Sequence, residues 1–215
     1  FLLGLERCGC VGEETGWIPR YLCLWDGEEL VAATALYRKH HSQGEFVFDQ
    51  SWAEAAHRVG FPYYPKLVAA APFSPVAGPR LLIAPGHAAA QLRSLLLVAT
   101  RALASEEPVT GVHWLFTSLD EADFFRAEGI PIREGMQFQW TNASYRDFDD
   151  FLARFSSKRR NQIRRERRRL REEGVTTRVL RGAEIDQEAI DYAYQFYVQT
   201  IERYFFGQRY LNRDF

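Results

Sequence analysis

Prolines are concentrated in one short part of this sequence. Six of the nine prolines fall between residues 62 and 85. Proline fixes the backbone angle φ and carries no N–H donor, so this region cannot form a long helix. The overlapping segment 37–80 also mixes aromatic, glycine and ionisable residues. Such a rigid, irregular segment is typical of loops that shape a surface cleft, and the alternative is a solvated connection.

Two carboxylates in this segment are candidates for acid–base chemistry. Residues 45–49 alternate phenylalanine with polar neighbours, which predicts a short strand. Glu45 and Asp49 would share one face of that strand, one as a general base and the other as its orienter. The alternative is a pair of surface carboxylates held by ion pairs.

Cationic and aromatic residues of the same segment are candidates for binding an anionic substrate. Prolines fix the backbone around them, and charge beside aromatic surface is typical of ligand pockets. We expect one concave surface to hold Lys39, His41, Tyr64, Lys66 and Arg80. The alternative is that Lys66 and Arg80 are structural and lie buried against carboxylates such as Glu45 or Asp49.

Cysteine usage and hydropathy indicate a cytoplasmic protein. Cys8, Cys10 and Cys23 lack the spacing of a zinc site, so no metal is expected, and three thiols favour a reducing compartment. The apolar runs are far shorter than the roughly 18 residues of a membrane span. No secretory signal is visible.

Turn and periodicity signals predict a mixed α/β sheet in residues 1–142. Asp26-Gly27 marks a hairpin turn between strands at 21–25 and 30–37. Ser51 is the expected N-cap of the second helix. Other strands are expected at 45–49, 67–71, 111–118 and 137–142, and helices at 1–10, 52–59, 88–104 and 120–129.

The pattern restarts after residue 142. A helix is expected at 148–174, a strand at 175–180 and an aromatic-rich helix at 185–205. A lone strand cannot satisfy its backbone groups, so it either completes the first sheet or belongs to an incomplete second domain. We predict two units, residues 1–142 and 146–215.

The expected helix at 148–174 carries a strong positive charge. Residues 158–173 hold nine basic and three acidic residues, which leaves −7 for the rest of a chain whose net charge is −1. The cations could bind phosphates of tRNA or of a nucleotide-linked precursor, or the helix could simply be solvated. The candidate polyanion-binding residues are Lys158, Arg159, Arg160, Arg164, Arg165 and Arg168.

Long strings of this sequence resemble a bacterial family related to FemAB. Its members are often labelled GNAT-type N-acetyltransferases or peptidoglycan biosynthesis proteins. The strings are HSQGEFVFDQSWAEAAHRVGFPYYPKL (41–67), PFSPVAGPRLL (72–82), QFQWTN (137–142), FSSKRRNQIRRER (155–167) and YLNRDF (210–215).

The resemblance implies an α/β (α+β) fold with two tandem GNAT-like domains, the second of them incomplete because family members run longer at the C-terminus. It also implies transfer of an activated acyl or aminoacyl group to an amine, for example an amine of a cell-wall precursor. The donor would be aminoacyl-tRNA or acyl-CoA. The alternative is a non-catalytic module that uses the GNAT scaffold to bind an anionic ligand or nucleic acid.

A cofactor site is not evident in the sequence. A GNAT enzyme holds the CoA pyrophosphate on a Q/R-x-x-G-x-G/A loop that opens a helix. The corresponding loop here reads LLIAPGHAAA before the helix at 88–104, with one glycine in the wrong position.

We therefore expect this chain not to bind acetyl-CoA tightly, because its first domain lacks the backbone cradle for the pyrophosphate. Isothermal titration calorimetry with acetyl-CoA should show no tight binding. A dissociation constant in the micromolar range or below would contradict the expectation.

Overall fold

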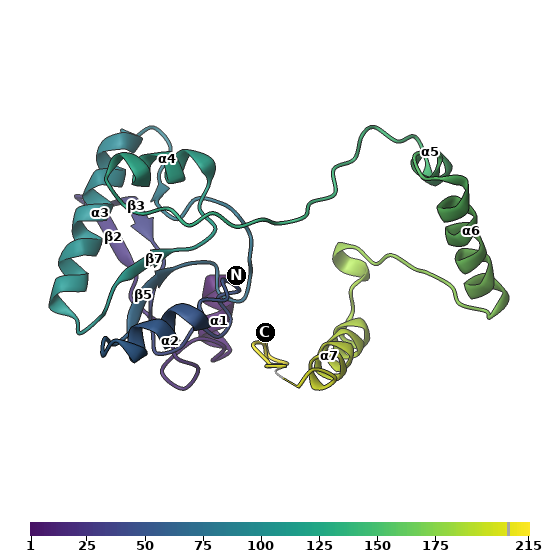
Figure 1. Cartoon of the computed structure of the whole chain (residues 1–215), viewed down its shortest axis with the longest axis horizontal. Coiled ribbons are helices and arrows are strands. Elements are labelled where there is room, and N and C mark those ends of the chain that lie inside the picture. The colour runs from purple at the N-terminus through teal and green to yellow at the C-terminus, as the bar shows by residue number, and fades with distance from the viewer. Residues whose placement is uncertain (206) are drawn as a thin grey trace. The chain divides into compact units, whose positions relative to one another are not determined.

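A computed structural model describes residues 1–205 and 207–215 (Figure 1). The chain forms two compact units, one of residues 1–132 with 196–215 and one of residues 133–195. Among the described residues, none of the helices combines the length and the apolar composition needed to cross a bilayer. The two predicted GNAT-like domains, residues 1–142 and 146–215, stay a prediction, because compactness does not establish domain ancestry.

The first unit contains a four-stranded mixed sheet. Its order is β1 (Trp17–Pro19), β4 (Leu36–Lys39), β5 (Lys66–Ala69) and β7 (Val112–Trp114). The first three strands pair antiparallel, whereas β5 and β7 are parallel. Parallel strands need a crossover, which the long helix α3 (Ala89–Glu106) provides.

A second sheet has the order β2 (Leu22–Asp26), β3 (Glu29–Thr34) and β6 (Leu82–Ile83), all antiparallel. The predicted hairpin is confirmed, with Gly27 at a positive φ of 59° in its turn. Its second strand is divided between β3 and β4, so one extended stretch enters both sheets. The predicted α/β (α+β) class is confirmed by these two sheets and their helices.

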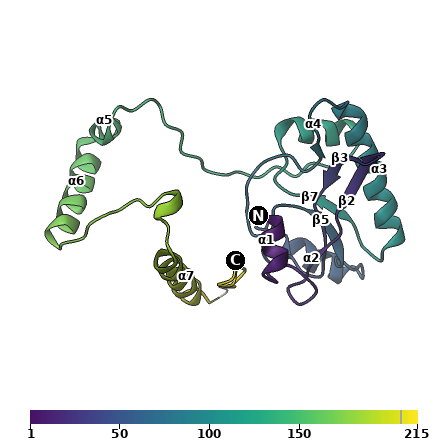
Figure 2. The same ribbon diagram turned by 180° about the vertical axis from the view of Figure 1, so that it is seen from behind.

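Helix α3 joins the two sheets through their apolar side chains. Leu96 packs in a buried cluster with Ala32 of β3 and with Phe125 of α4 (Leu119–Ala127). Leu103 packs near the other end of α3 against Leu67 of β5 and its neighbours. Helices α1 (Leu2–Arg7) and α2 (Gln50–Arg58) lie at the opposite end of the unit from α4, and Figure 2 shows the same arrangement from behind.

Three predicted strands are absent from the described residues. Residues 45–49 form a loop in which Phe46 and Phe48 have positive φ values of 59° and 50°. The alternation of residue types wrongly predicts a strand here, because Glu45 and Asp49 both form ion pairs with the buried Lys66. Helix α2 accordingly starts one residue before Ser51, with Asp49 at its N-cap.

Residues 137–142 and 175–180 are also not strands. The alternating apolar residues of 137–142 do not pack on a sheet, and Phe138 is 92% exposed. An unpaired strand cannot satisfy its backbone groups, which explains why neither segment becomes one.

The second unit is built from α5 (Phe148–Ala153), α6 (Ser157–Glu172), a short 3₁₀ turn (Gly182–Glu184) and the beginning of α7 (Gln187–Glu202). Asp147 caps α5 and Ser156 caps α6 through side-chain oxygens. Four aromatic rings pack around Phe151 of α5: Trp140, Tyr145, Phe148 and Phe155. Helix α6 buries no residue, which agrees with its high charge.

Candidate functional site

The register of the first sheet places two lysines side by side. Lys39 of β4 lies opposite Trp17 of β1 on one side and opposite Lys66 of β5 on the other. Side chains directly opposite each other share one face of a sheet. Both lysine side chains are completely buried. Two buried like charges at this spacing are destabilising, so this row requires compensating acids.

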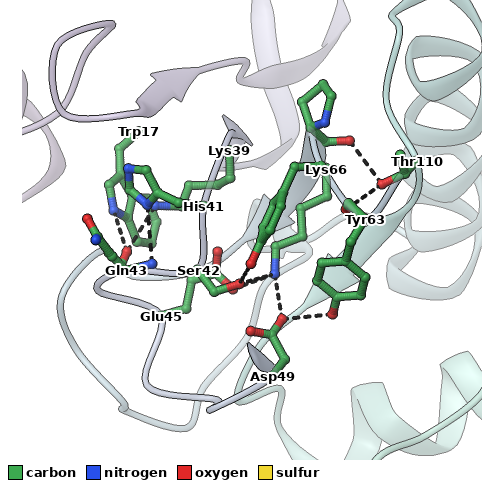
Figure 3. Close-up of polar contacts among 12 residues, drawn as sticks. Trp17, Lys39, His41, Ser42, Gln43, Glu45, Asp49, Tyr63, Lys66 and Thr110 are labelled. Atoms are coloured by element: carbon green, nitrogen blue, oxygen red, sulfur yellow. Dashed lines mark hydrogen bonds and ion pairs between the residues drawn. The ribbon is translucent and has the colours of Figure 1, made fainter. Parts of the chain in front are cut away.

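The loop before α2 supplies the acids to Lys66. The Lys66 Nζ donates hydrogen bonds to Glu45 Oε2 at 2.8 Å, Asp49 Oδ2 at 2.7 Å and Ser42 Oγ at 2.9 Å (Figure 3). All three ammonium hydrogens therefore have acceptors. The rings of Tyr63 and Tyr64 lie 5.1 and 5.5 Å from the same nitrogen, a distance that adds cation–π attraction.

The two carboxylates of this cluster differ in their affinity for protons. Burial raises the pKa of Glu45 above its usual range, and the charge of Lys66 offsets this only in part. Burial also acts against ionisation of Asp49, but hydrogen bonds from Lys66 and Tyr63 hold the pKa of Asp49 below its usual range. Each carboxylate keeps one buried oxygen without a hydrogen-bond partner among the described residues, Glu45 Oε1 and Asp49 Oδ1.

Lys39 has a different environment from Lys66. Its Nζ lies 3.7 Å from the ring centre of Trp17 and donates to the backbone carbonyl of Gln43 at 3.0 Å. The Trp17 indole N–H donates to the same carbonyl at 3.1 Å. Burial lowers the pKa of Lys39 to about 7, although the charge of Glu45 opposes the change. This amine therefore gains or loses its proton near neutral pH.

A groove beside α2 reaches this cluster. It has a volume of about 600 Å³, within the range of ligand pockets. A second hollow of about 400 Å³ lies on the Trp52 side of the helix, and Tyr63 lines both. The groove is lined by Ala53, Glu54, His57, Arg58, Phe61, Pro62, Tyr63 and Tyr64.

Two tyrosine hydroxyls connect the groove to the cluster. The hydroxyl of Tyr63 donates to Asp49 Oδ2 at 2.8 Å, and that of Tyr64 lies 2.7 Å from Ser42 Oγ. Asp49 and Ser42 both accept hydrogen bonds from Lys66. The buried ammonium is thus linked to the groove through two short chains of hydrogen bonds.

The structure brings together most of the predicted site residues. Lys39, Tyr64 and Lys66 meet with Glu45 and Asp49 in one cluster. The predicted pair of carboxylates thus converges, although from a loop rather than a strand. Lys66 matches the structural alternative, because its ammonium is neutralised and has no exposed surface. Binding an anionic substrate would need a free ammonium, which neither Lys39 nor Lys66 offers.

His41 lies at the edge of the cluster. Its Nδ1 accepts a hydrogen bond from the backbone N–H of Gln43 at 3.2 Å, in the loop that also contacts Lys39. Burial and the nearby charge of Lys39 lower the pKa of His41.

Arg80 lies apart from the other candidates. Its guanidinium donates to the carbonyls of Leu115 at 2.7 Å and Phe116 at 3.2 Å, beyond the C-terminal end of β7. Lys66 begins β5, which is parallel to β7, so the two cations occupy opposite ends of the sheet. The backbone N–H of Arg80 also donates to Glu121 of α4, which lies away from α2 in both views (Figure 1, Figure 2). The structure therefore does not support one surface that includes Arg80.

Sequence reasoning missed several contributors to the site. Trp17 comes from a distant strand, and only the register of the sheet reveals its contact with Lys39. The Gln43 carbonyl leaves no signal in a side-chain pattern. Tyr63 is not among the site residues predicted from the sequence, although its hydroxyl donates a hydrogen bond to Asp49. In the part of the chain that the structure describes, no three metal-ligating side chains are grouped together.

Helix α6 is the second candidate site, for a polyanion. Three of its nine cations pair with carboxylates, Arg164 with Asp149, Arg168 with Glu172 and Arg169 with Glu173. Within the described ranges, the six other cations have no carboxylate partner: Lys158, Arg159, Arg160, Arg165, Arg167 and Arg171. The helix therefore keeps a net positive surface.

Comparison with known protein families gives a match over the whole chain. The model of the FemAB-like family, described as peptidoglycan biosynthesis/recognition, matches residues 1–215. No curated protein and no solved structure matches the chain.

Lys39 should make stability depend on pH. Between about pH 7 and pH 10.5 the unfolded chain holds the Lys39 proton and the folded chain does not. The unfolded state then binds more protons, so the free energy of unfolding should rise with pH, by at most about 1.4 kcal/mol per unit. Urea denaturation of the protein and of Lys39→Met at several pH values isolates this term. A constant difference from pH 7 to 9 would contradict it.

Proposed function

This chain belongs to the FemAB-like family, whose described role is peptidoglycan biosynthesis or recognition, and on that premise we propose that it is an acyl- or aminoacyltransferase. The group would pass from aminoacyl-tRNA or acyl-CoA to an amine of a cell-wall precursor. The observation that carries the proposal is the buried Lys66 between two carboxylates with oppositely shifted pKa values, next to a groove.

The chemistry of acyl transfer explains why such a pair is useful. An aliphatic amine is protonated at neutral pH and must lose a proton to attack an activated ester. Two titratable groups whose environments push their pKa values apart are suited to different tasks. Glu45, with the raised pKa, is the better proton acceptor. Asp49, with the lowered pKa, keeps its charge and orients Lys66 and Tyr63.

The groove beside α2 suits an acceptor with both apolar and polar parts. Phe61 and Pro62 give it an apolar wall, and Glu54 and Arg58 form an exposed ion pair on the helix. The hydroxyl-bearing rings of Tyr63 and Tyr64 separate it from the buried cluster. Holding the amine here would convert a bimolecular encounter into a positioned reaction.

Helix α6 would supply the phosphate contacts that an aminoacyl-tRNA donor requires. Six of its cations have no carboxylate partner, so the helix has a net positive and largely exposed surface. Phosphate contacts dominate the affinity of proteins for nucleic acids. The proposed contact residues are those predicted from the sequence: Lys158, Arg159, Arg160, Arg164, Arg165 and Arg168. Of these, Arg164 and Arg168 already have carboxylate partners, so we expect the other four to contribute more.

A non-catalytic recognition module is the second candidate function. Every hydrogen of the Lys66 ammonium is already bonded, and Glu45 is only 2% exposed. A cluster with this geometry could simply hold the loop beside a binding groove. If the protein is a transferase, a change at Glu45 should lower the rate of transfer. If it is a recognition module, the same change should affect only the stability of the fold.

Replacing Glu45 tests the transferase directly. Glu45→Gln keeps the shape of the side chain but cannot accept a proton, so transfer should fall about a hundredfold or more. The assay would follow a labelled aminoacyl group from tRNA, or an acyl group from CoA, to a nucleotide-linked precursor peptide. Glu128→Gln, at an exposed carboxylate outside the groove, is the matched control. A folded Glu45→Gln protein with unchanged transfer would refute Glu45 as proton acceptor, and no transfer by the unmodified protein would favour the recognition module.

Salt dependence tests the role of α6. Binding of tRNA should weaken steeply as salt increases, because phosphate contacts release counterions that high salt restores. Replacing Arg160 and Arg165 with glutamine should reduce the slope of log K against log salt by roughly two. Replacing Arg126 and Arg133 outside α6 is the control. Binding that ignores salt, or an unaltered slope in the α6 variant, would contradict the proposal.

A further inference from the structure

The proposed proton acceptor has no direct access to the groove. Glu45 is 2% exposed, and its Oε2 faces Lys66 rather than a tyrosine of the groove. An amine held in the groove therefore cannot pass its proton straight to Glu45. Proton transfer requires groups within hydrogen-bond reach of one another, or a chain of such groups.

One continuous chain of exchangeable hydrogens spans this gap. Tyr64 lines the groove, and its hydroxyl lies 2.7 Å from Ser42 Oγ. Ser42 Oγ lies 2.9 Å from Lys66 Nζ, which lies 2.8 Å from Glu45 Oε2 (Figure 3). Each of these distances is that of an ordinary or short hydrogen bond. Each intermediate atom can both give and receive a hydrogen, provided that Lys66 first yields one to Glu45.

The neighbouring tyrosine does not offer an equivalent chain. The hydroxyl of Tyr63 ends on Asp49 Oδ2, an oxygen that already accepts from Lys66. An ionised carboxylate is an acceptor only, so it has no hydrogen to pass on. Tyr63 therefore positions Asp49, whereas Tyr64 leads through Ser42 to Lys66.

We propose that Tyr64 and Ser42 form a proton path between the α2 groove and the Lys66–Glu45 pair. The path rests on the proposed function only for the identity of its proton source, the ammonium of an amine substrate. Ser42 was not among the candidate site residues that the sequence suggested.

The transfer balances along the chain. An N–H bond of Lys66 breaks and the hydrogen moves to Glu45 Oε2, which leaves a neutral amine beside a neutral carboxylic acid. The neutral amine then rotates about its Cε–Nζ bond so that its lone pair faces Ser42 Oγ and takes the proton of Ser42. Ser42 takes the proton of Tyr64, and Tyr64 takes a proton of the substrate ammonium. Glu45 has gained one proton, the substrate amine has lost one, and Lys66, Ser42 and Tyr64 are restored. The reverse sequence returns the proton to the groove when the leaving group needs it.

Exchange of the Lys66 ammonium hydrogens with water tests the path without any substrate. These hydrogens are observed through ¹⁵N NMR of Nζ in the full chain, with Lys66→Arg used for assignment. Tyr64→Phe and Ser42→Ala should slow the exchange roughly tenfold or more, because each removes one hydroxyl from the relay. Ser42→Thr keeps a hydroxyl and should restore the rate.

Tyr63→Phe is the matched control, since it removes a hydroxyl from the same groove and the same cluster but not from the path. Its exchange rate should stay closer to that of the unmodified protein than to that of Tyr64→Phe. Equal slowing by the two tyrosine variants, or no slowing by Tyr64→Phe, would overturn the path. If exchange follows the path but no acyl transfer is ever detected, the proposed function fails and the path stands. If transfer occurs and exchange ignores Tyr64, the path alone fails.

Discussion

Burying the ammonium of Lys66 removes hydration worth several kcal/mol, which only close, correctly placed oxygens can replace. Those oxygens come from Ser42, Glu45 and Asp49, and this requirement determines the conformation of the whole loop before α2. As a strand, this segment could not direct both carboxylates at the Lys66 Nζ. Positive φ values at Phe46 and Phe48 are the local cost of that convergence, and such strain persists only where surrounding contacts hold it.

The cluster connects the sheet to the surface groove. Lys39 and Lys66 are fixed by strand register, whereas Tyr63 and Tyr64 reach the groove from the segment just before β5. Asp49 joins the two, because its Oδ2 accepts hydrogen bonds from both Lys66 and Tyr63. A rigid row of strands therefore positions groups that a loop alone would hold loosely, which is the arrangement expected of a site whose geometry has to be accurate.

Local signals in the sequence predicted the regular parts of the fold well. The Asp26-Gly27 turn and the periodic helix at 88–104 depend on short-range chemistry and are confirmed. Alternation failed at residues 45–49 because a long-range charge contact overrode it. The sequence identified Glu45 and Asp49 as a pair but did not show that both bind Lys66. The burial of Lys66 depends on strand pairing, which local patterns do not reveal. The sequence also placed Arg80 with the other candidates because it is close to them along the chain. Closeness along the chain does not determine which end of a sheet a side chain reaches.

The mutual dependence of Lys66, Glu45 and Asp49 also limits how this protein can change during evolution. Loss of one member leaves an uncompensated buried charge, at a cost of about 3–5 kcal/mol, whereas replacing a complete ionic set with apolar residues is often neutral. A sequence that has lost only one member should therefore be less stable than a sequence with the complete set or with none of it. A lineage would have to change all three residues at once, so we expect Lys66, Glu45 and Asp49 to vary together.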